Sequence, residues 1–146
     1  MIKDLIITPL SIIEAEGGNV MHAMKNSDNG FCGFGEAYFS LIKRNAIKGW
    51  KRHREMTLNI VVPMGQIKFI LFDDYSNFLE PESYREIILS LENYNRITIP
   101  PMIWVGFQGQ GEDYSMLVNL ANLSHNSEEV DTMKLDKMQY DWRGNN

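Results

Sequence analysis

Short runs of apolar, β-branched and aromatic residues recur along the chain, and residues typical of turns separate them. The run 66–73 starts with alternating polar and apolar residues, as a strand with one buried face does. Similar runs predict strands over residues 37–42, 57–62, 66–73, 84–89, 96–100, 104–108 and 115–121. Many short, evenly spaced strands are typical of an antiparallel sandwich or barrel. Only residues 127–133 are expected to form a helix, and that helix would be short.

The prolines indicate where one strand ends, and the chain length indicates the number of domains. Pro100 and Pro101 cannot both lie in a central strand, because proline has no backbone N–H for the ladder, so we place them at a strand end. A length of 146 residues suits one domain. We therefore expect a single all-β domain over residues 1–146, with an N-terminal arm over about 1–35 and a C-terminal tail over about 125–146.

Composition narrows the classes of function. Fourteen Lys and Arg residues against 19 Asp and Glu residues give a net charge of −5, which argues against nucleic acid as a partner. The basic run 48–54 is local and suits a small anion such as a phosphate. Cys32 is the single cysteine, so an intrachain disulfide and cysteine-rich zinc sites are excluded. The sequence has neither a signal-peptide core nor a membrane-length apolar run, so we expect a cytoplasmic protein that contacts no membrane.

The basic run also holds the residues best suited to chemistry. If it enters a sheet, Lys51 and His53 share one face, while Trp50 and Arg52 share the other. An imidazole beside a lysine is expected to stay neutral and to be able to act as a general base near pH 7. An exposed edge with solvated charges is the plain alternative. The other histidines, at 22 and 125, fall in predicted loops, and this scatter predicts no metal site and no cofactor.

Four segments carry motifs of a known family. Residues 48–51 read Lys-Gly-Trp-Lys, and residues 99–107 read Ile-Pro-Pro-Met-Ile-Trp-Val-Gly-Phe. Gly65 with the strand 67–73, and the acidic, Trp-ending segment 136–142, are the other two. In this order they resemble the dTDP-4-dehydrorhamnose 3,5-epimerase family and the related sugar-nucleotide 3,4-ketoisomerases. In the epimerases the first two segments read Arg-Gly-Leu-His and Ile-Pro-x-Gly-Phe-Ala-His-Gly-Phe.

The resemblance implies a cupin jelly roll, a homodimer, and a metal-independent isomerase or epimerase. Its substrate would be a nucleotide-linked 4-keto-6-deoxy sugar of bacterial polysaccharide biosynthesis. Such an enzyme removes a proton beside the ketone and stabilises the enolate. By this resemblance His53 is the base, Lys51 lies near the enolate oxygen, and Asp136 fixes the imidazole tautomer. Further residues suit the diphosphate, the base or the sugar: Arg44, Lys48, Arg52, Tyr38, Trp50, Trp104, Phe107 and Asn119.

Two positions depart from the family pattern. Lys51 stands where the epimerases have their His base, and of the ketoisomerases' His-x-His pair only His53 remains. The epimerases' Tyr acid has no counterpart at 116–119, and Tyr114 would reach that place only with a shift in register. These departures keep two alternatives open: a non-catalytic cupin that binds a sugar nucleotide or saccharide, and a structural role in polysaccharide biosynthesis.

Overall fold

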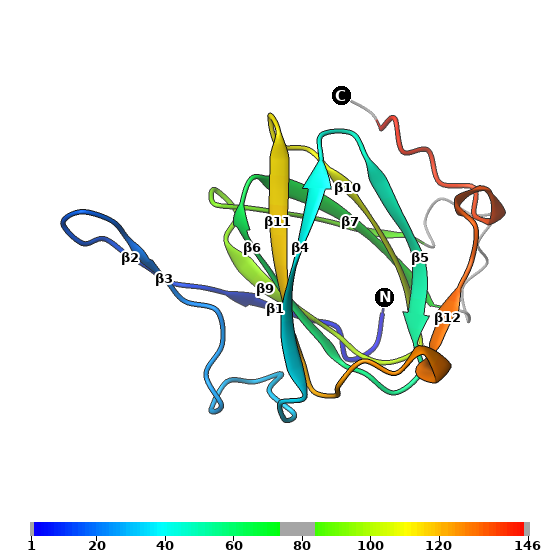
Figure 1. Ribbon diagram of the computed structural model, residues 1–146, viewed down its shortest axis with the longest axis horizontal. Helices are drawn as coiled ribbons and strands as arrows, with labels where there is room; N and C mark the ends of the chain where they lie inside the picture. The colour runs from blue at the N-terminus through cyan, green and yellow to red at the C-terminus, as the bar shows by residue number, and fades with distance from the viewer. Residues whose placement is uncertain (1, 74–83, 145–146) are drawn as a thin grey trace.

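A computed structural model describes residues 2–73 and 84–144 of the chain, and they form an almost entirely β structure (Figure 1). Its main strands are β1 (Ile6–Pro9), β4 (Glu36–Lys43), β5 (Ile47–His53), β6 (Leu58–Met64), β7 (Gln66–Asp73), β8 (Arg85–Ser90), β9 (Asn95–Ile99), β10 (Ile103–Gly109), β11 (Tyr114–Ala121) and β12 (Val130–Thr132).

Within these residues the strands make two five-stranded antiparallel sheets that face each other. The first sheet has the order β1-β9-β6-β11-β4, and the second has the order β12-β5-β10-β7-β8. From β4 to β7, and again from β9 to β12, successive strands alternate between the two sheets. This connectivity is that of a cupin-type jelly roll, so the fold predicted from the sequence is confirmed.

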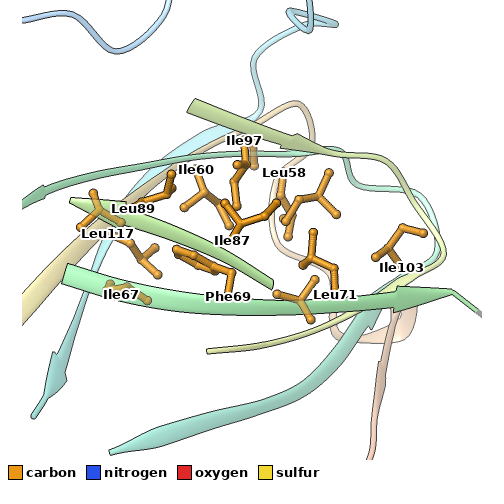
Figure 2. Close-up of a cluster of buried hydrophobic side chains, with 14 of the residues drawn as sticks. Leu58, Ile60, Ile67, Phe69, Leu71, Ile87, Leu89, Ile97, Ile103 and Leu117 are labelled. Carbon is orange, nitrogen blue, oxygen red and sulfur yellow. The ribbon is translucent and has the colours of Figure 1, made fainter. Parts of the chain in front are cut away.

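The core lies between the two sheets. Alternate residues of β7 point inward, among them Phe69 and Leu71, and meet Leu58 and Ile60 from β6 in the opposite sheet (Figure 2). These side chains are almost fully buried, and each contributes about 1.5–3 kcal/mol of burial free energy. The inward-facing residues therefore hold the two layers together, and some of them also line a pocket between the sheets.

The outer face of the second sheet is also covered. Ile70 and Phe72 of β7 pack there with Trp50 and Trp104, and the C-terminal segment adds Met138. The rings of Tyr140 and Trp142 lie over the same cluster. Strand β7 is buried on both faces for this reason, which explains its long apolar stretch after the alternating start.

The strands predicted from the alternation are all present, with ends that differ by one or two residues. The predicted helix over 127–133 is wrong: a short 3₁₀ turn, η2 (Ser127–Glu129), leads directly into β12. Part of the expected N-terminal arm belongs to the body, because β1 pairs with β9. Residues 145–146 of the expected tail lie outside the described residues.

A small hairpin stands away from the two sheets. It consists of β2 (Ile12–Ile13) and β3 (Val20–Met21), and it projects from the body of the molecule (Figure 1). Its apolar side chains are largely exposed. In the part of the chain that the structure describes, no helix has the length and apolar character needed to cross a membrane.

Candidate functional site

A pocket of about 220 Å³ opens between the sheets and draws its walls from β4, β5, β6, β10 and β11. Its polar lining residues are Tyr38, Ser40, Lys48, Lys51 and His53. Its apolar lining residues are Leu58, Ile60, Val105, Phe107 and Leu117. A concave site with an apolar wall and a few converging polar groups is the usual form of a small-molecule site.

A bulge in β5 brings two lysines to the same side of the strand. Val105 of β10 pairs with Lys51, but Phe107 pairs with Lys48, so Gly49 and Trp50 together oppose Gly106. The Gly49–Trp50 peptide bond is cis. Regular alternation would have turned Lys48 away from Lys51 and His53. The extra residue reverses the alternation, so all three side chains line the pocket.

His53 is held by a buried carboxylate. Strand β12 pairs with the end of β5, with Val130 opposite His53, and this places Glu129 of η2 against the imidazole. Nδ1 of His53 bonds to Oε1 of Glu129. A carboxylate only accepts hydrogen bonds, so Nδ1 carries the proton and Nε2 of the neutral ring keeps its lone pair. His53 therefore has the tautomer that a general base in the pocket requires.

Backbone donors hold the same carboxylate in its ionised form. Oε2 of Glu129 accepts hydrogen bonds from the backbone N–H of Glu55 at 3.0 Å and of Met56 at 3.2 Å. Burial raises the pKa of Glu129, but the hydrogen bonds from His53, Glu55 and Met56 outweigh burial and lower the pKa below its ordinary 4.5. The pair consequently places a fixed negative charge behind the imidazole at neutral pH.

A chain of buried amides fixes Tyr38 at the mouth of the pocket. Nδ2 of Asn119 donates to the Tyr38 hydroxyl at 3.1 Å, and Oδ1 of Asn119 accepts from the backbone N–H of Asn59 at 3.0 Å. The Asn59 side chain accepts from Thr98 at 2.6 Å and donates to the Gly30 carbonyl at 3.1 Å. Because the Tyr38 oxygen accepts the amide hydrogen bond, its own O–H proton remains available to another acceptor.

The structure brings part of the predicted site together. His53, Lys51, Lys48, Tyr38 and Phe107 all line the pocket, and Asn119 adjoins it through its hydrogen bond to Tyr38.

Other predicted residues lie on the opposite face of the second sheet. Trp50 is completely buried there beside Trp104 in the outer cluster. The guanidinium of Arg52 lies 4.8 Å from the centre of the Trp104 ring and donates two hydrogen bonds to Asp131, at 2.8 and 3.0 Å. Arg44 is exposed and lines a different hollow. These side chains do not reach the pocket as the structure stands.

Two acid assignments differ from what the structure places near the pocket. Asp136 is exposed in the 3₁₀ turn η3 (Leu135–Lys137), and the residue bound to His53 is Glu129. Tyr114 is exposed at the start of β11, where it pairs with Lys43, and the tyrosine that lines the pocket is Tyr38. The sequence reasoning missed Glu129 because it expected a helix over 127–133 and so did not place this segment beside β5.

The described residues bring no three His, Cys, Asp or Glu side chains together in a way that could hold a metal ion. The polar side chains that line the pocket carry an imidazole, a phenol, an aliphatic hydroxyl and two ammonium groups.

Comparisons with known proteins give a consistent picture. No protein-family model matches the chain. A dTDP sugar isomerase from Desulfovibrio desulfuricans G20 is 31% identical, with a TM-score of 0.87 over 99% of this chain and 94% of that chain. A curated relative from Haloferax volcanii, a probable low-salt glycan biosynthesis epimerase, is 26% identical over 100 residues. That match covers 68% of this chain and 64% of the relative's length.

More distant structures share the fold. A sugar 3,4-ketoisomerase from Thermoanaerobacterium thermosaccharolyticum, solved in complex with TDP, is 15% identical, with a TM-score of 0.75 over 94% of this chain and 93% of that chain. A dTDP-4-dehydrorhamnose 3,5-epimerase from Elizabethkingia anophelis NUHP1 is 18% identical, with a TM-score of 0.73 over 98% of this chain and 83% of that chain.

Proposed function

The chain belongs to the family of dTDP-sugar isomerases and epimerases, and from this premise we propose that it isomerises a nucleotide-linked 4-keto-6-deoxy sugar. The observation that carries the proposal is the His53–Glu129 pair, which lies in a pocket that also holds Lys51 and Tyr38. The proton of the imidazole is on Nδ1, so Nε2 can accept a proton from the carbon beside a ketone. The phenol of Tyr38 and the ammonium group of Lys51 can stabilise the charge that develops on the ketone oxygen.

The proposed reaction moves the ketone by one carbon. Nε2 of His53 takes the proton from the carbon next to the ketone and returns it to the former carbonyl carbon. The carbon that lost its hydrogen also carries a hydroxyl group, and the proton of this hydroxyl passes to the former carbonyl oxygen. Atoms and charge therefore balance. Tyr38 and Lys51 carry this oxygen-bound proton and stabilise the negative charge of the enediolate. Glu129 holds the imidazole and stabilises its cation while the proton is on Nε2.

The size of the pocket supports a proposal about which part of the substrate it holds. A volume of about 220 Å³ lies below the roughly 300–1,000 Å³ typical of sites for drug-sized ligands. We therefore place the sugar ring inside the pocket and the nucleotide at its mouth. Lys48 is exposed there, and its Nζ already donates to the Leu41 carbonyl at 3.0 Å. Its ammonium group has further donors for a diphosphate.

Proton NMR of dTDP-4-keto-6-deoxyglucose in D₂O tests the proposal. The wild-type protein should introduce deuterium beside the ketone and produce a 3-keto sugar. His53→Asn should lower this rate by at least about 100-fold, because the general base is removed. His125→Asn, which changes an exposed histidine outside the pocket lining, should leave the rate unchanged. Tyr38→Phe should slow product formation more than His125→Asn does.

The possible outcomes separate the candidate functions. An epimer in place of the 3-keto sugar would keep His53 as the base and replace isomerisation by inversion. Full activity of His53→Asn would remove His53 from the mechanism. Ligand-dependent stabilisation without any exchange would make the protein a binding module.

We further propose that the protein is a homodimer formed through the outer face of the first sheet. On that face of β4, Phe39 is 69% exposed and Leu41 is 48% exposed. The projecting β2–β3 hairpin exposes Ile13 and Val20, and an isolated two-stranded hairpin is marginally stable in water. A second copy covering both features would remove this apolar surface from water.

A further inference from the structure

A second hollow lies on the outer face of the second sheet, between the end of the C-terminal segment and the β4–β5 turn. Its volume is about 770 Å³. Strands β7 and β10 form its floor through Gln66, Lys68 and Gln108. Among the described residues, those that line this hollow are all different from those that line the pocket of His53.

Lys68 is a buried cation in this hollow. The residue is only 5% exposed, and its Nζ lies 5.4 Å from the centre of the Tyr140 ring and 5.9 Å from that of Trp142. Within the described ranges, no carboxylate lies at ion-pair distance from this ammonium group. Burial of a charge without a paired ion is costly, and the ring faces offset only part of that cost.

The acidic groups around Lys68 are already engaged. Glu86 lines the hollow and accepts a hydrogen bond from the Tyr140 hydroxyl. Asp141 accepts from Nε of Arg143 at 3.2 Å and from its backbone N–H at 3.0 Å. The position next to Lys68 is occupied by Gly144, where a Cβ would lie 3.3 Å from Nζ. The ammonium group therefore lies against backbone and rings, and Asp141 acts on it only from beyond ion-pair distance.

Two arginines line the same hollow. Arg44 enters it from the β4–β5 turn, and Arg143 enters it from the C-terminal segment. With Lys68 they bring three cations together near two carboxylates, Glu86 in the lining and Asp141 paired with Arg143, in a chain whose net charge is −5. Guanidinium groups match the geometry of phosphate oxygens, and the ring of Trp142 adds a flat apolar wall.

We propose that this hollow is a second ligand site, which binds a small phosphate-bearing molecule with Lys68 beneath the phosphate and Arg44 and Arg143 beside it. The site does not depend on the isomerase activity, because it shares no lining residue with the other pocket in the described part of the chain.

Titration with pyrophosphate tests the site. The readout is the indole N–H signal of Trp142 in a ¹H–¹⁵N spectrum, assigned by its loss in Trp142→Phe. Pyrophosphate should shift this signal in the wild-type protein and in Lys51→Met, which alters only the other pocket. Lys68→Met should weaken the binding at least about tenfold, because a charge-assisted contact is lost. Arg44→Gln should weaken it as well, and Arg85→Gln, an exposed arginine outside the hollow, should not.

The variants also guard against loss of fold. Met is as long as the aliphatic stem of Lys and packs well against rings, so Lys68→Met should unfold at or above the wild-type temperature. Arg44 is exposed, so its replacement tests the site without touching buried contacts. The proposal would be overturned if pyrophosphate did not shift the Trp142 signal of the wild-type protein. It would also be overturned if the signal shifted in Lys68→Met and did not shift in Lys51→Met. Neither result bears on the deuterium-exchange experiment.

Discussion

Glu129 shows how much a single side chain contributes to the pocket. It is 5% exposed, and its two oxygens accept hydrogen bonds from the His53 ring and from the backbone of Glu55 and Met56. It therefore closes the turn after β5 and orients the imidazole at the same time. Removal of its charge should affect both stability and catalysis.

Glu129→Gln gives a prediction about pH. The folded state lowers the pKa of Glu129 below 4.5, so this carboxylate contributes stability above that pH, and the contribution is lost as the pH falls through the folded-state value. The Gln variant should be less stable than wild type at pH 7, and the difference should shrink toward pH 3. Urea unfolding at several pH values measures it. A difference that does not vary with pH would contradict the predicted role.

The same variant separates a positioning role from a purely structural one. Gln can still accept a hydrogen bond, but it supplies no negative charge for the imidazolium. We expect kcat to fall at least about tenfold and its pH profile to change shape, while KM changes little. A fall in activity that only follows the loss of folded protein would favour the structural role.

At the scale of elements, the bulge in β5 was the least predictable feature of the site. Alternation along the sequence predicts which residues of a regular strand share a face, and it placed Lys51 and His53 together correctly. The arrival of Lys48 on that face depends on the pairing of β5 with β10, which is set by contacts distant in the sequence. For the same reason, the sequence alone did not predict a strand over residues 130–132, because that strand depends on its pairing with β5.

Gly106 lies opposite this bulge and leads to a prediction about stability. A Cβ there would lie 2.7 and 2.8 Å from ring atoms of Trp50 and 3.1 Å from the Trp142 ring. Trp50 is fully buried and cannot move aside without disturbing the outer cluster. Gly106→Ala should therefore destabilise the protein by about 1–3 kcal/mol, as overpacking does. Chemical denaturation measures this, and an unchanged midpoint would show that the ring has room to shift.

At the scale of the whole molecule, the two sheets differ in what covers their outer faces. The C-terminal segment covers the second sheet with Met138, Tyr140 and Trp142, whereas the first sheet exposes Phe39 and Leu41 of β4. Strand spacing predicted an antiparallel sandwich or barrel, and the resemblance to a known family implied the jelly roll, but neither could predict this asymmetry. The covering residues reach the sheet from the far end of the chain, and short-range patterns carry no information about such contacts.

The exposed face predicts the oligomeric state. Wild-type protein should elute with twice the 16.9 kDa mass of one chain in size-exclusion chromatography with light scattering. Phe39→Asp should shift it to the monomer mass, because a charge in the centre of an apolar interface is not solvated. Leu91→Asp replaces an apolar residue of similar exposure in the turn between β8 and β9, so it should leave the mass unchanged. A monomeric wild-type protein would refute the dimer.

The position of Glu129 after the strands of the pocket in the sequence also bears on synthesis. A nascent polypeptide that has emerged only to Asn122 already holds β4, β5, β6, β10 and β11, the strands whose side chains line the pocket. It lacks the carboxylate that fixes the imidazole. The His53–Glu129 pair that we propose for catalysis is thus completed only after the pocket strands are translated, so we expect a ribosome-bound chain of that length to be inactive.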